Sequence, residues 1–463
     1  MIAILEKVYG LVWGVPALVL ILGVGLLLSV RTGFVQLRLF PAACRDFWRR
    51  LRHRDDAQGV SAFQALCTAL AATVGTGNLA GVAGALAIGG PGAIFWMWVS
   101  AVVGMATKYH EGVLAIMYKG KDDMGNPQGG PMHIIEKGMG PKWKPLARFF
   151  AIAGLFGTMC IMNANQLTEA FMAAFTNPDD IAASAFLSKI GAFFSLENYQ
   201  AYRLLFGCAI AVIVGLVILG GIKRIANVAS VLVPFMVGMY FLMVLYIILT
   251  NLHAVPAAVA SIFREAFNLR AGIGALAGIA IIGARRAALV NDAGIGTASI
   301  MHGASANKNA VREGLIAMLG PSIDSGLVCT LTAIAILICG NIDVEGIKGL
   351  EIAMGAFAKG IPMGDILLML VVVCFALSSM FSYSFYGTSC ATYLFGTRIG
   401  KYYRWFFLAT LIVFAVVPIE AAVGACDLFY ALMAIPTMIA ILTLSPRVRK
   451  ATREYFKKEK SDK

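Results

Sequence analysis

Apolar segments long enough to cross a lipid bilayer recur along the whole chain, and this feature limits the possible folds more than any other. A transmembrane helix needs about 17 to 25 predominantly apolar residues. Such segments lie near residues 10–30, 62–88, 92–118, 147–175, 203–220, 227–250, 272–302, 314–339, 366–394, 404–423 and 427–445. The short alternating segments of membrane β-barrels are not part of this pattern. The sequence therefore predicts an all-α integral membrane protein with about eleven transmembrane helices.

The positions of the charged residues orient these helices. Only 14% of the residues are charged, against about 25% in a typical soluble domain, so water is not the main solvent of this fold. The net charge of +13 would suggest a nucleic-acid partner in a soluble protein, but here its distribution among the loops decides. Lys and Arg gather in alternate loops, at 31–54, 119–148, 223–224, 308–312, 398–404 and 447–463. Because basic loops remain in the cytoplasm, we expect a multi-pass inner-membrane protein with its N-terminus outside and its C-terminus in the cytoplasm.

The sequence lacks the signatures of several other classes of protein. Met1 to Gly10 have neither the basic start nor the cleavage site of a signal peptide, so Val12 to Val30 is expected to stay as a span. The nine cysteines are scattered singly, without the spacing of a zinc site. No nucleotide-binding GxxxxGK[ST] motif and no GxSxG or HExxH motif occurs. We therefore expect a carrier and not an enzyme; a channel remains an alternative, which counterflow would distinguish.

Two of the predicted helices contain glycine-rich interruptions. The first, Ala71 to Asn78, reads AATVGTGN. The second is a series of glycines at Gly272, Gly274, Gly278 and Gly283. They begin the second and seventh spans, five helices apart, which is the spacing of two inverted five-helix repeats. Unwound helices there would offer N–H groups to a carboxylate and carbonyl groups to a cation; alternatively, the small residues only let helices pack closely.

Longer motifs carry a resemblance to a known family. Thr73 to Glu111 reads TVGTGNLAGVAGALAIGGPGAIFWMWVSAVVGMATKYHE, and Gly129 to Gly138 reads GGPMHIIEKG. Both closely resemble the alanine or glycine:cation symporter family. Weaker matches follow in order at Asn291 to Gly294, Asp324, Cys329 to Ala333, Phe385 to Gly387 and Met433 to Pro436.

The resemblance implies a LeuT-type fold of five plus five helices preceded by one extra helix. Residues 1–58 would then hold the extra helix and a basic loop, 59–256 the first repeat, 257–446 the inverted second repeat, and 447–463 a basic tail. It also implies uptake of alanine or glycine coupled to sodium, by alternating access. A carrier of the same fold with proton coupling, or with a different small amino acid, is the alternative. No obligatory protein partner is evident beside the substrate and the lipid bilayer.

The chain departs from the family pattern at several positions in the helices that should face the substrate. The family usually has Trp at Tyr383, two Thr at Ser378 and Ser379, Gln at Asn163, Asn at Thr437 and Arg at Ile281. These departures put the identity of the substrate in doubt more than membership of the family.

The expected substrate site combines the first interruption with two later helices. Thr76, Gly77 and Asn78 would receive the carboxylate, although Asn78 is alternatively a helix cap. Asn163 is the preferred pocket residue among three amides of one apolar helix, and Gln166, on the same face, is equally an interhelical contact. Tyr383 would form an aromatic wall, and Gly278 of the second interruption completes the set.

The expected sodium site consists of oxygen ligands. Ala71 and Val74 would contribute backbone carbonyl groups, and Ser378 and Ser379 would contribute hydroxyl groups. The alternative for the serine pair is a bond to the carbonyl groups of its own helix.

Ionisable residues at membrane depth are candidates for function by default. They are Glu111, Arg285, Arg286, Asp292 and Asp324. Arg285 and Arg286 precede Asp292 near a predicted helix end, where either a gating salt bridge or a pair extended toward the interface is possible. His110 is expected at the membrane interface.

Overall fold

The computed structural model describes residues 15–52, 61–267, 273–340, 349–417 and 419–461. This part of the chain is built of helices, apart from one small hairpin in which β1 (Gly120–Lys121) pairs antiparallel with β2 (Pro127–Gln128). The prediction of an all-α protein is therefore confirmed. The predicted start at Met1 to Gly10 and the glycine at 272 lie outside the described residues.

The helices follow the predicted apolar segments closely. In the first half of the chain they are α2 (Val15–Arg31), α3 (Val35–Arg38), α4 (Phe40–Arg52), α5 (Ala62–Thr73), α6 (Gly77–Gly89), α7 (Gly92–Met117), α8 (Pro131–Ile134), η1 (Ile135–Met139), η2 (Pro141–Trp143), α9 (Lys144–Gly157), α10 (Ile161–Phe175), α11 (Pro178–Ala183), α12 (Ala185–Phe194) and α13 (Asn198–Ile218). In the second half they are α14 (Gly221–Thr250), α15 (Val255–Ala266), α16 (Ile273–Asn291), α17 (Thr297–Ala304), α18 (Ala310–Pro321), η4 (Ser322–Val328), α19 (Cys329–Cys339), α20 (Leu350–Gly360), α21 (Gly364–Phe395), α22 (Thr397–Gly400), α23 (Tyr403–Val416) and α24 (Ile419–Ser461).

Among the described residues, seven helices are long and apolar enough to cross a membrane, or eight if the bent pair α5 and α6 counts as one span. Such helices suit a membrane transporter, while the total of about eleven remains a prediction. The predicted span near 272–302 is interrupted, because it contains α16 and α17 with a break between them. The segment near 314–339 lies within one continuous helix, Ala310–Cys339, which includes the π-helical turn η4.

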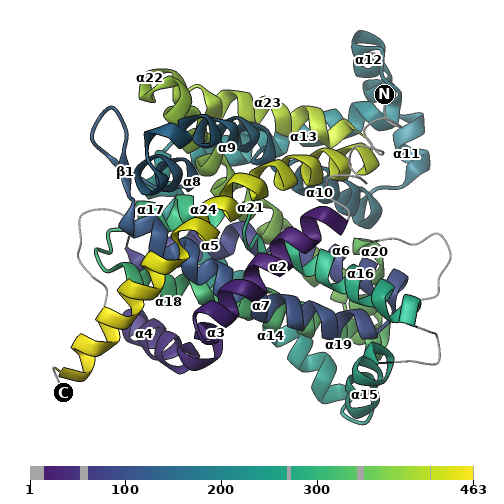
Figure 1. Ribbon diagram of the computed structural model, residues 1–463. Coiled ribbons are helices and arrows are strands. Elements are labelled where there is room, and N and C mark those ends of the chain that lie inside the picture. Colours follow the sequence, from purple (N-terminus) through teal and green to yellow (C-terminus); the bar gives the residue numbers. More distant parts are fainter. Residues whose placement is uncertain (1–14, 53–60, 268–272, 341–348, 418, 462–463) are drawn as a thin grey trace.

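The helices divide into a buried centre and an apolar periphery (Figure 1). Helix α21 lies at the centre, and 72% of its most apolar window is buried, against 33% for α14 at the periphery. Outward-facing side chains of the peripheral helices are apolar; Val231 and Leu242 of α14 are 74% and 65% exposed. A surface of this kind is unfavourable in water and suits the lipid interior.

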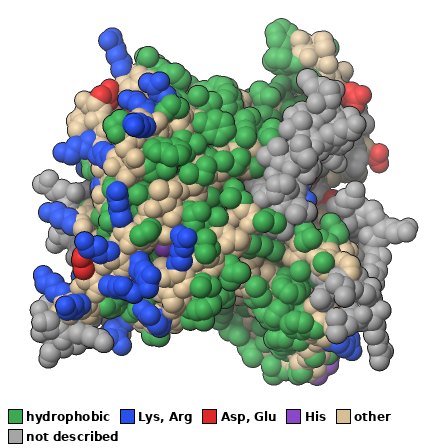
Figure 2. Space-filling model, viewed as in Figure 1, with side chains coloured by type: hydrophobic (Ala, Val, Ile, Leu, Met, Phe, Trp, Pro, Cys, Tyr) green, Lys and Arg blue, Asp and Glu red, His purple; other side chains and the backbone are tan. Residues whose placement is uncertain are grey.

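Charged side chains concentrate at one end of this arrangement. Figure 2 shows Lys and Arg gathered on the side that carries α4, the β hairpin and the end of α24, next to a broad apolar band. Helices α6 and α20 lie on the opposite side (Figure 1). The basic side is the one for which the sequence predicts a cytoplasmic position by the positive-inside rule.

The glycine interruption predicted in the seventh span is wrong for the described residues. Helix α16 runs without a break through Gly274, Gly278 and Gly283 and ends at Asn291. Glycine weakens a helix by only about 1 kcal/mol, which is less than the several kcal/mol that an unpaired backbone group costs in a membrane. At Gly283 the missing side chain permits close packing, because a Cβ there would overlap the carbonyl oxygen of Ala93. The chain leaves the helical conformation further on, at 292–296.

Candidate functional site

The first break lies between α5 and α6, which are bent by 41° relative to each other. The N–H of Gly75 is capped by Oδ1 of Asn78 at 2.9 Å. The N–H groups of Thr76 and Gly77 have no hydrogen-bond partner among the described residues. The N-terminus of α6 therefore offers two free donors and the positive end of a helix dipole.

The second break lies between α16 and α17. Asp292, Gly294 and Gly296 have φ angles of 50°, 87° and 96°, which end the helical conformation. Oδ1 of Asn291 accepts a hydrogen bond from the N–H of Ala293 at 3.0 Å, and a carboxylate oxygen of Glu111 accepts one from the N–H of Gly294 at 2.7 Å. Glu111 thus serves as a buried cap for this break, a role that its position in the sequence did not reveal.

A cavity of about 420 Å³ connects the two breaks. It extends along α6 to Ile88, which is 66% exposed, so the cavity reaches the end of α6 that faces away from the basic side. Its walls come from α5, α6, α10, α16, α20, α21 and α24, and they include Thr73, Gly75, Gly77, Gly84, Cys160, Asn163, Gln166, Arg286, Val290, Asp292, Ile352, Ser379, Tyr383 and Tyr430.

Three of the four residues predicted to bind sodium, Ala71, Ser378 and Ser379, come together, and Val74 lies in the break that follows α5. The hydroxyl groups of Ser378 and Ser379 lie 3.3 and 3.1 Å from the carbonyl oxygen of Ala71. Each hydroxyl also lies 3.0 Å from the carbonyl oxygen of Phe375 in its own helix. These groups are buried, and they are all hard oxygen donors of the kind that sodium prefers. Of the four predicted residues, only Ser379 also lines the cavity.

Four of the residues predicted to bind substrate lie in or directly behind the cavity wall. Gly77, Asn163 and Tyr383 line it. The hydroxyl of Thr76 donates to Oδ1 of Asn163 at 2.7 Å and so holds the Asn163 side chain in its position in the cavity wall. A Cβ at Gly77 would lie 3.9 Å from its nearest neighbours, Met162 and Val290, so the glycine leaves open space beside the N-terminus of α6.

Two predicted substrate residues do not line the cavity. The amide of Asn78 is fully buried and donates to Asp324 in η4, so its side chain ties α6 to this π-helix in addition to capping Gly75. Gly278 lies within the continuous part of α16 and has no atom within 4 Å of the position of a Cβ. Asn78 therefore has the position of a helix cap, which was the alternative to a contact with the substrate.

Asp292 is the feature of the cavity that the predicted site omitted. Its Oδ2 accepts hydrogen bonds from the hydroxyl groups of Tyr383 and Thr297, the latter at 3.3 Å. Tyr430 donates in turn to the hydroxyl of Tyr383 at 2.7 Å. Oδ1 has no hydrogen-bond partner among the described residues. The signal for Asp292 was its place among the ionisable residues at membrane depth, but the sequence did not show that it faces the substrate cavity.

The other ionisable candidates take different places. Arg286, five residues before the end of α16, lines the cavity, with its guanidinium 3.5 Å from the position of a Cβ at Gly84. His110 is fully buried and hydrogen-bonds the carbonyl of Ala106 at 2.7 Å, so its side chain packs inside the protein. Lys108, two residues earlier, is only 4% exposed.

A second, much smaller cavity of about 20 Å³ lies toward the basic side. Thr73 lines both cavities, and Lys108, Asn291 and His302 provide polar groups in the second. This volume suffices for about one water molecule.

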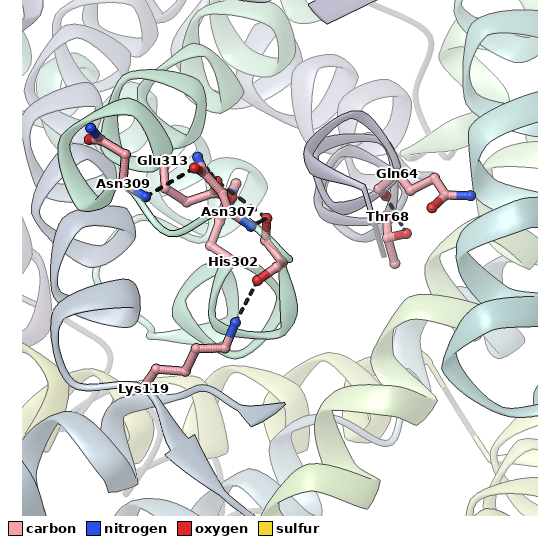
Figure 3. A network of polar contacts seen from close by, with 8 residues as sticks. Gln64, Thr68, Lys119, His302, Asn307, Asn309 and Glu313 are labelled. Atoms are coloured by element: carbon pink, nitrogen blue, oxygen red, sulfur yellow. Dashed lines mark hydrogen bonds and ion pairs between the residues drawn. The ribbon is translucent and has the colours of Figure 1, made fainter. Parts of the chain in front are cut away.

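A buried polar network surrounds the far end of that small cavity (Figure 3). Glu313 is fully buried and pairs with Nδ1 of His302 at 2.7 Å, while Asn307 and Ser305 donate to its other oxygen at 2.8 and 3.3 Å. Lys119 donates to the carbonyl of Ser305 at 2.5 Å. The network fastens α17, α18 and the segment after α7 to one another opposite Gln64 and Thr68 of α5.

Comparisons with known proteins identify the family of this chain. The profile of the sodium:alanine symporter family matches residues 1–463. The sodium/alanine symporter AgcS of Methanococcus maripaludis is 37% identical over 467 residues, covering 100% of this chain and 98% of the relative. An uncharacterized transporter of Haemophilus influenzae is 36% identical, covering 99% and 97%. YrbD of Bacillus subtilis, named as a proposed sodium/proton-dependent alanine carrier, is 33% identical, covering 97% and 91%.

Each match covers nearly the whole of this chain and nearly the whole of the relative, as the shared motifs predicted. Members of this family are transporters that work as symporters, and they are not enzymes. The chain belongs to the sodium:alanine symporter family, and its buried cavity between two broken helices is the candidate transport site.

Proposed function

We propose that this chain is a secondary active transporter that takes up a small neutral amino acid, such as alanine or glycine, together with sodium. One observation carries the proposal. The free N-terminus of α6 at Gly77 and the carboxylate of Asp292 face the same buried cavity. An amino acid carries one negative and one positive group, and this cavity offers a complementary partner for each.

The substrate carboxylate would bind at the first break. The N–H groups of Thr76 and Gly77 are free, and the dipole of α6 places partial positive charge at the same point. Gly77 lets the ligand approach the backbone, since a Cβ there would project into the open space. Asn163, held by the hydroxyl of Thr76, would contribute a side-chain contact.

The substrate ammonium group would bind at the second break. Oδ2 of Asp292 is already engaged by Tyr383 and Thr297, which leaves Oδ1 for a ligand. Burial strengthens a charge-assisted hydrogen bond of this kind. Because the two charged partners belong to different breaks, the substrate would hold the two broken helices together.

Sodium would bind between α5 and α21. The carbonyl oxygens of Ala71 and Val74 and the hydroxyl groups of Ser378 and Ser379 would be its ligands, with both hydroxyls turning from Phe375 toward the ion. Ser379 also lines the substrate cavity, so the ion site and the substrate site share a wall. Such a shared wall is one physical basis for coupled transport.

The shape of the cavities supports alternating access within an inverted-repeat fold. The large cavity reaches the end of α6 away from the basic side, whereas the polar network around Glu313 closes the basic side. With the basic side in the cytoplasm, this arrangement corresponds to an outward-open carrier in the inner membrane. The repeats at 59–256 and 257–446, each of which begins with a broken helix, would rearrange to open the other end.

Uptake by purified protein in liposomes tests the proposal. Radiolabelled alanine should accumulate with an inward sodium gradient, and potassium in its place at the same pH should abolish accumulation. Asp292, Glu111 and Asp324 are buried carboxyl groups near the breaks, so proton coupling is the alternative. Accumulation driven by a pH gradient without sodium would favour that alternative.

A further inference from the structure

The basic side of the molecule contains a cleft that the transport site does not use. Its volume is about 650 Å³, and it lies between the end of α2 and the second half of α24. The two helices are in contact and run side by side in Figure 1. The lining residues are Arg31, Thr32, Ser445, Pro446, Arg449, Lys450, Arg453 and Glu454.

The charge of this cleft is strongly positive. Arg453 lies four residues after Arg449 and three after Lys450, so it is a helical neighbour of both on α24. Arg31 faces them from the last position of α2. All four side chains are exposed. The one acidic side chain of the lining, Glu454, lies 3.9 Å from Lys450. Three arginines therefore remain in excess within a single concave surface.

The cleft lies at the level where the two helices change from apolar to basic. The guanidinium of Arg31 donates to the hydroxyl of Ser445 at 3.4 Å, which aligns the end of α2 with the end of the apolar part of α24. On the apolar side of this level, Val19, Leu26 and Val30 of α2 are 62%, 53% and 58% exposed. Figure 2 shows the basic side chains next to the apolar band.

We propose that this cleft binds the headgroup of an anionic phospholipid. The phosphate would lie among Arg31, Arg449 and Arg453, because guanidinium groups bind phosphate oxygens in pairs. The acyl chains would lie along the exposed apolar surface of α2. An acidic protein segment would satisfy the charges but not this apolar surface, so the lipid fits both features. The lipid would join α2, which precedes the proposed repeats, to the last helix.

Thermal unfolding of the full-length protein in detergent, after removal of bound lipid, tests the proposal. Phosphatidylglycerol should raise the unfolding midpoint of the wild-type protein more than phosphatidylcholine does. The variant Arg449→Gln/Arg453→Gln keeps the helix propensity but removes two cations. Each basic residue near an anionic lipid surface contributes about 1 kcal/mol, so its affinity for phosphatidylglycerol should fall about thirtyfold, or about 2 kcal/mol.

A matched variant controls for loss of charge in general. Arg398→Gln/Lys401→Gln removes two exposed cations at α22, outside the cleft, and should bind phosphatidylglycerol like the wild type. Equal stabilisation of the cleft variant and the wild type would overturn the proposal. So would equal effects of the two lipids, which would mean binding through acyl chains alone, or full stabilisation by inorganic phosphate at the same concentration.

Discussion

The hydroxyl group of Tyr383 donates a hydrogen bond to Oδ2 of Asp292 and so ties α21 to the break after α16. Tyr430 donates to Tyr383, and the two rings stack with centroids 6.4 Å apart and planes inclined by 10°. This pair holds the carboxylate in one orientation without engaging Oδ1. The departure from the tryptophan expected at position 383 therefore changes a polar contact of the site as well as its shape.

Asp292→Asn should weaken binding of alanine by about tenfold to a hundredfold, because a hydrogen bond to a charged group contributes about 1.5 to 3 kcal/mol. The amide retains an acceptor for Tyr383, so the fold should persist. Isothermal titration with alanine measures the effect. Tyr383→Phe is the comparison: it removes the bond that orients Asp292, together with the bond from Tyr430, but keeps the carboxylate, so it should cost less, about fivefold. Wild-type affinity in Asp292→Asn would exclude the proposed ammonium contact.

Ser378→Ala combined with Ser379→Ala should raise the sodium concentration needed for half-maximal uptake at least tenfold. Both hydroxyls approach the carbonyl oxygen of Ala71, and their loss removes two oxygen ligands from a dehydrated cation. Ser384→Ala is a matched control on the same helix, since Ser384 is equally buried but bonds only the carbonyl of Phe381. A sodium titration unchanged in the double variant would show that the pair bonds only its own helix.

Gly77→Ala should fold normally and lose binding of alanine. A Cβ at this position would have ordinary contacts at 3.9 Å, yet it would stand where the carboxylate approaches the N–H groups of α6. Loss of alanine-induced thermal stabilisation is the expected result. Gly278→Ala, in the open part of α16, should keep that stabilisation and gain up to about 1 kcal/mol of helix propensity. Normal stabilisation of Gly77→Ala by alanine would move the carboxylate site elsewhere.

Glu313→Leu should lower the thermal unfolding midpoint strongly, because it leaves His302, Ser305 and Asn307 without their shared acceptor. Removing one partner of a buried polar network costs about 3 to 5 kcal/mol. Glu313→Gln keeps an acceptor oxygen and should lose less. Glu454→Leu, at an exposed position of α24, should leave the midpoint nearly unchanged. A similar midpoint for Glu313→Leu and Glu454→Leu would show that the network contributes little to stability.

The sequence by itself determined that this protein is surrounded by lipid, that it is helical, and where its first broken helix lies. Long apolar segments leave the backbone only one way to pair its polar groups in lipid, so the helices follow from composition and spacing. The order VGTGN in positions 74–78 also predicted where α5 ends, since two glycines there permit a free helix N-terminus. The serine pair and Ala71 were correctly expected to meet.

Only the tertiary structure decided which polar groups face the cavity. Gly278 and Asn78 met the local criteria for a site, but α16 is continuous at Gly278, and the amide of Asn78 turns toward Asp324. Asp292 and Tyr430 are far apart in the chain and become parts of one site through Tyr383. The physical reason is that a buried polar group is satisfied by whichever partner packing brings within hydrogen-bond distance, and sequence spacing along single helices does not contain that information.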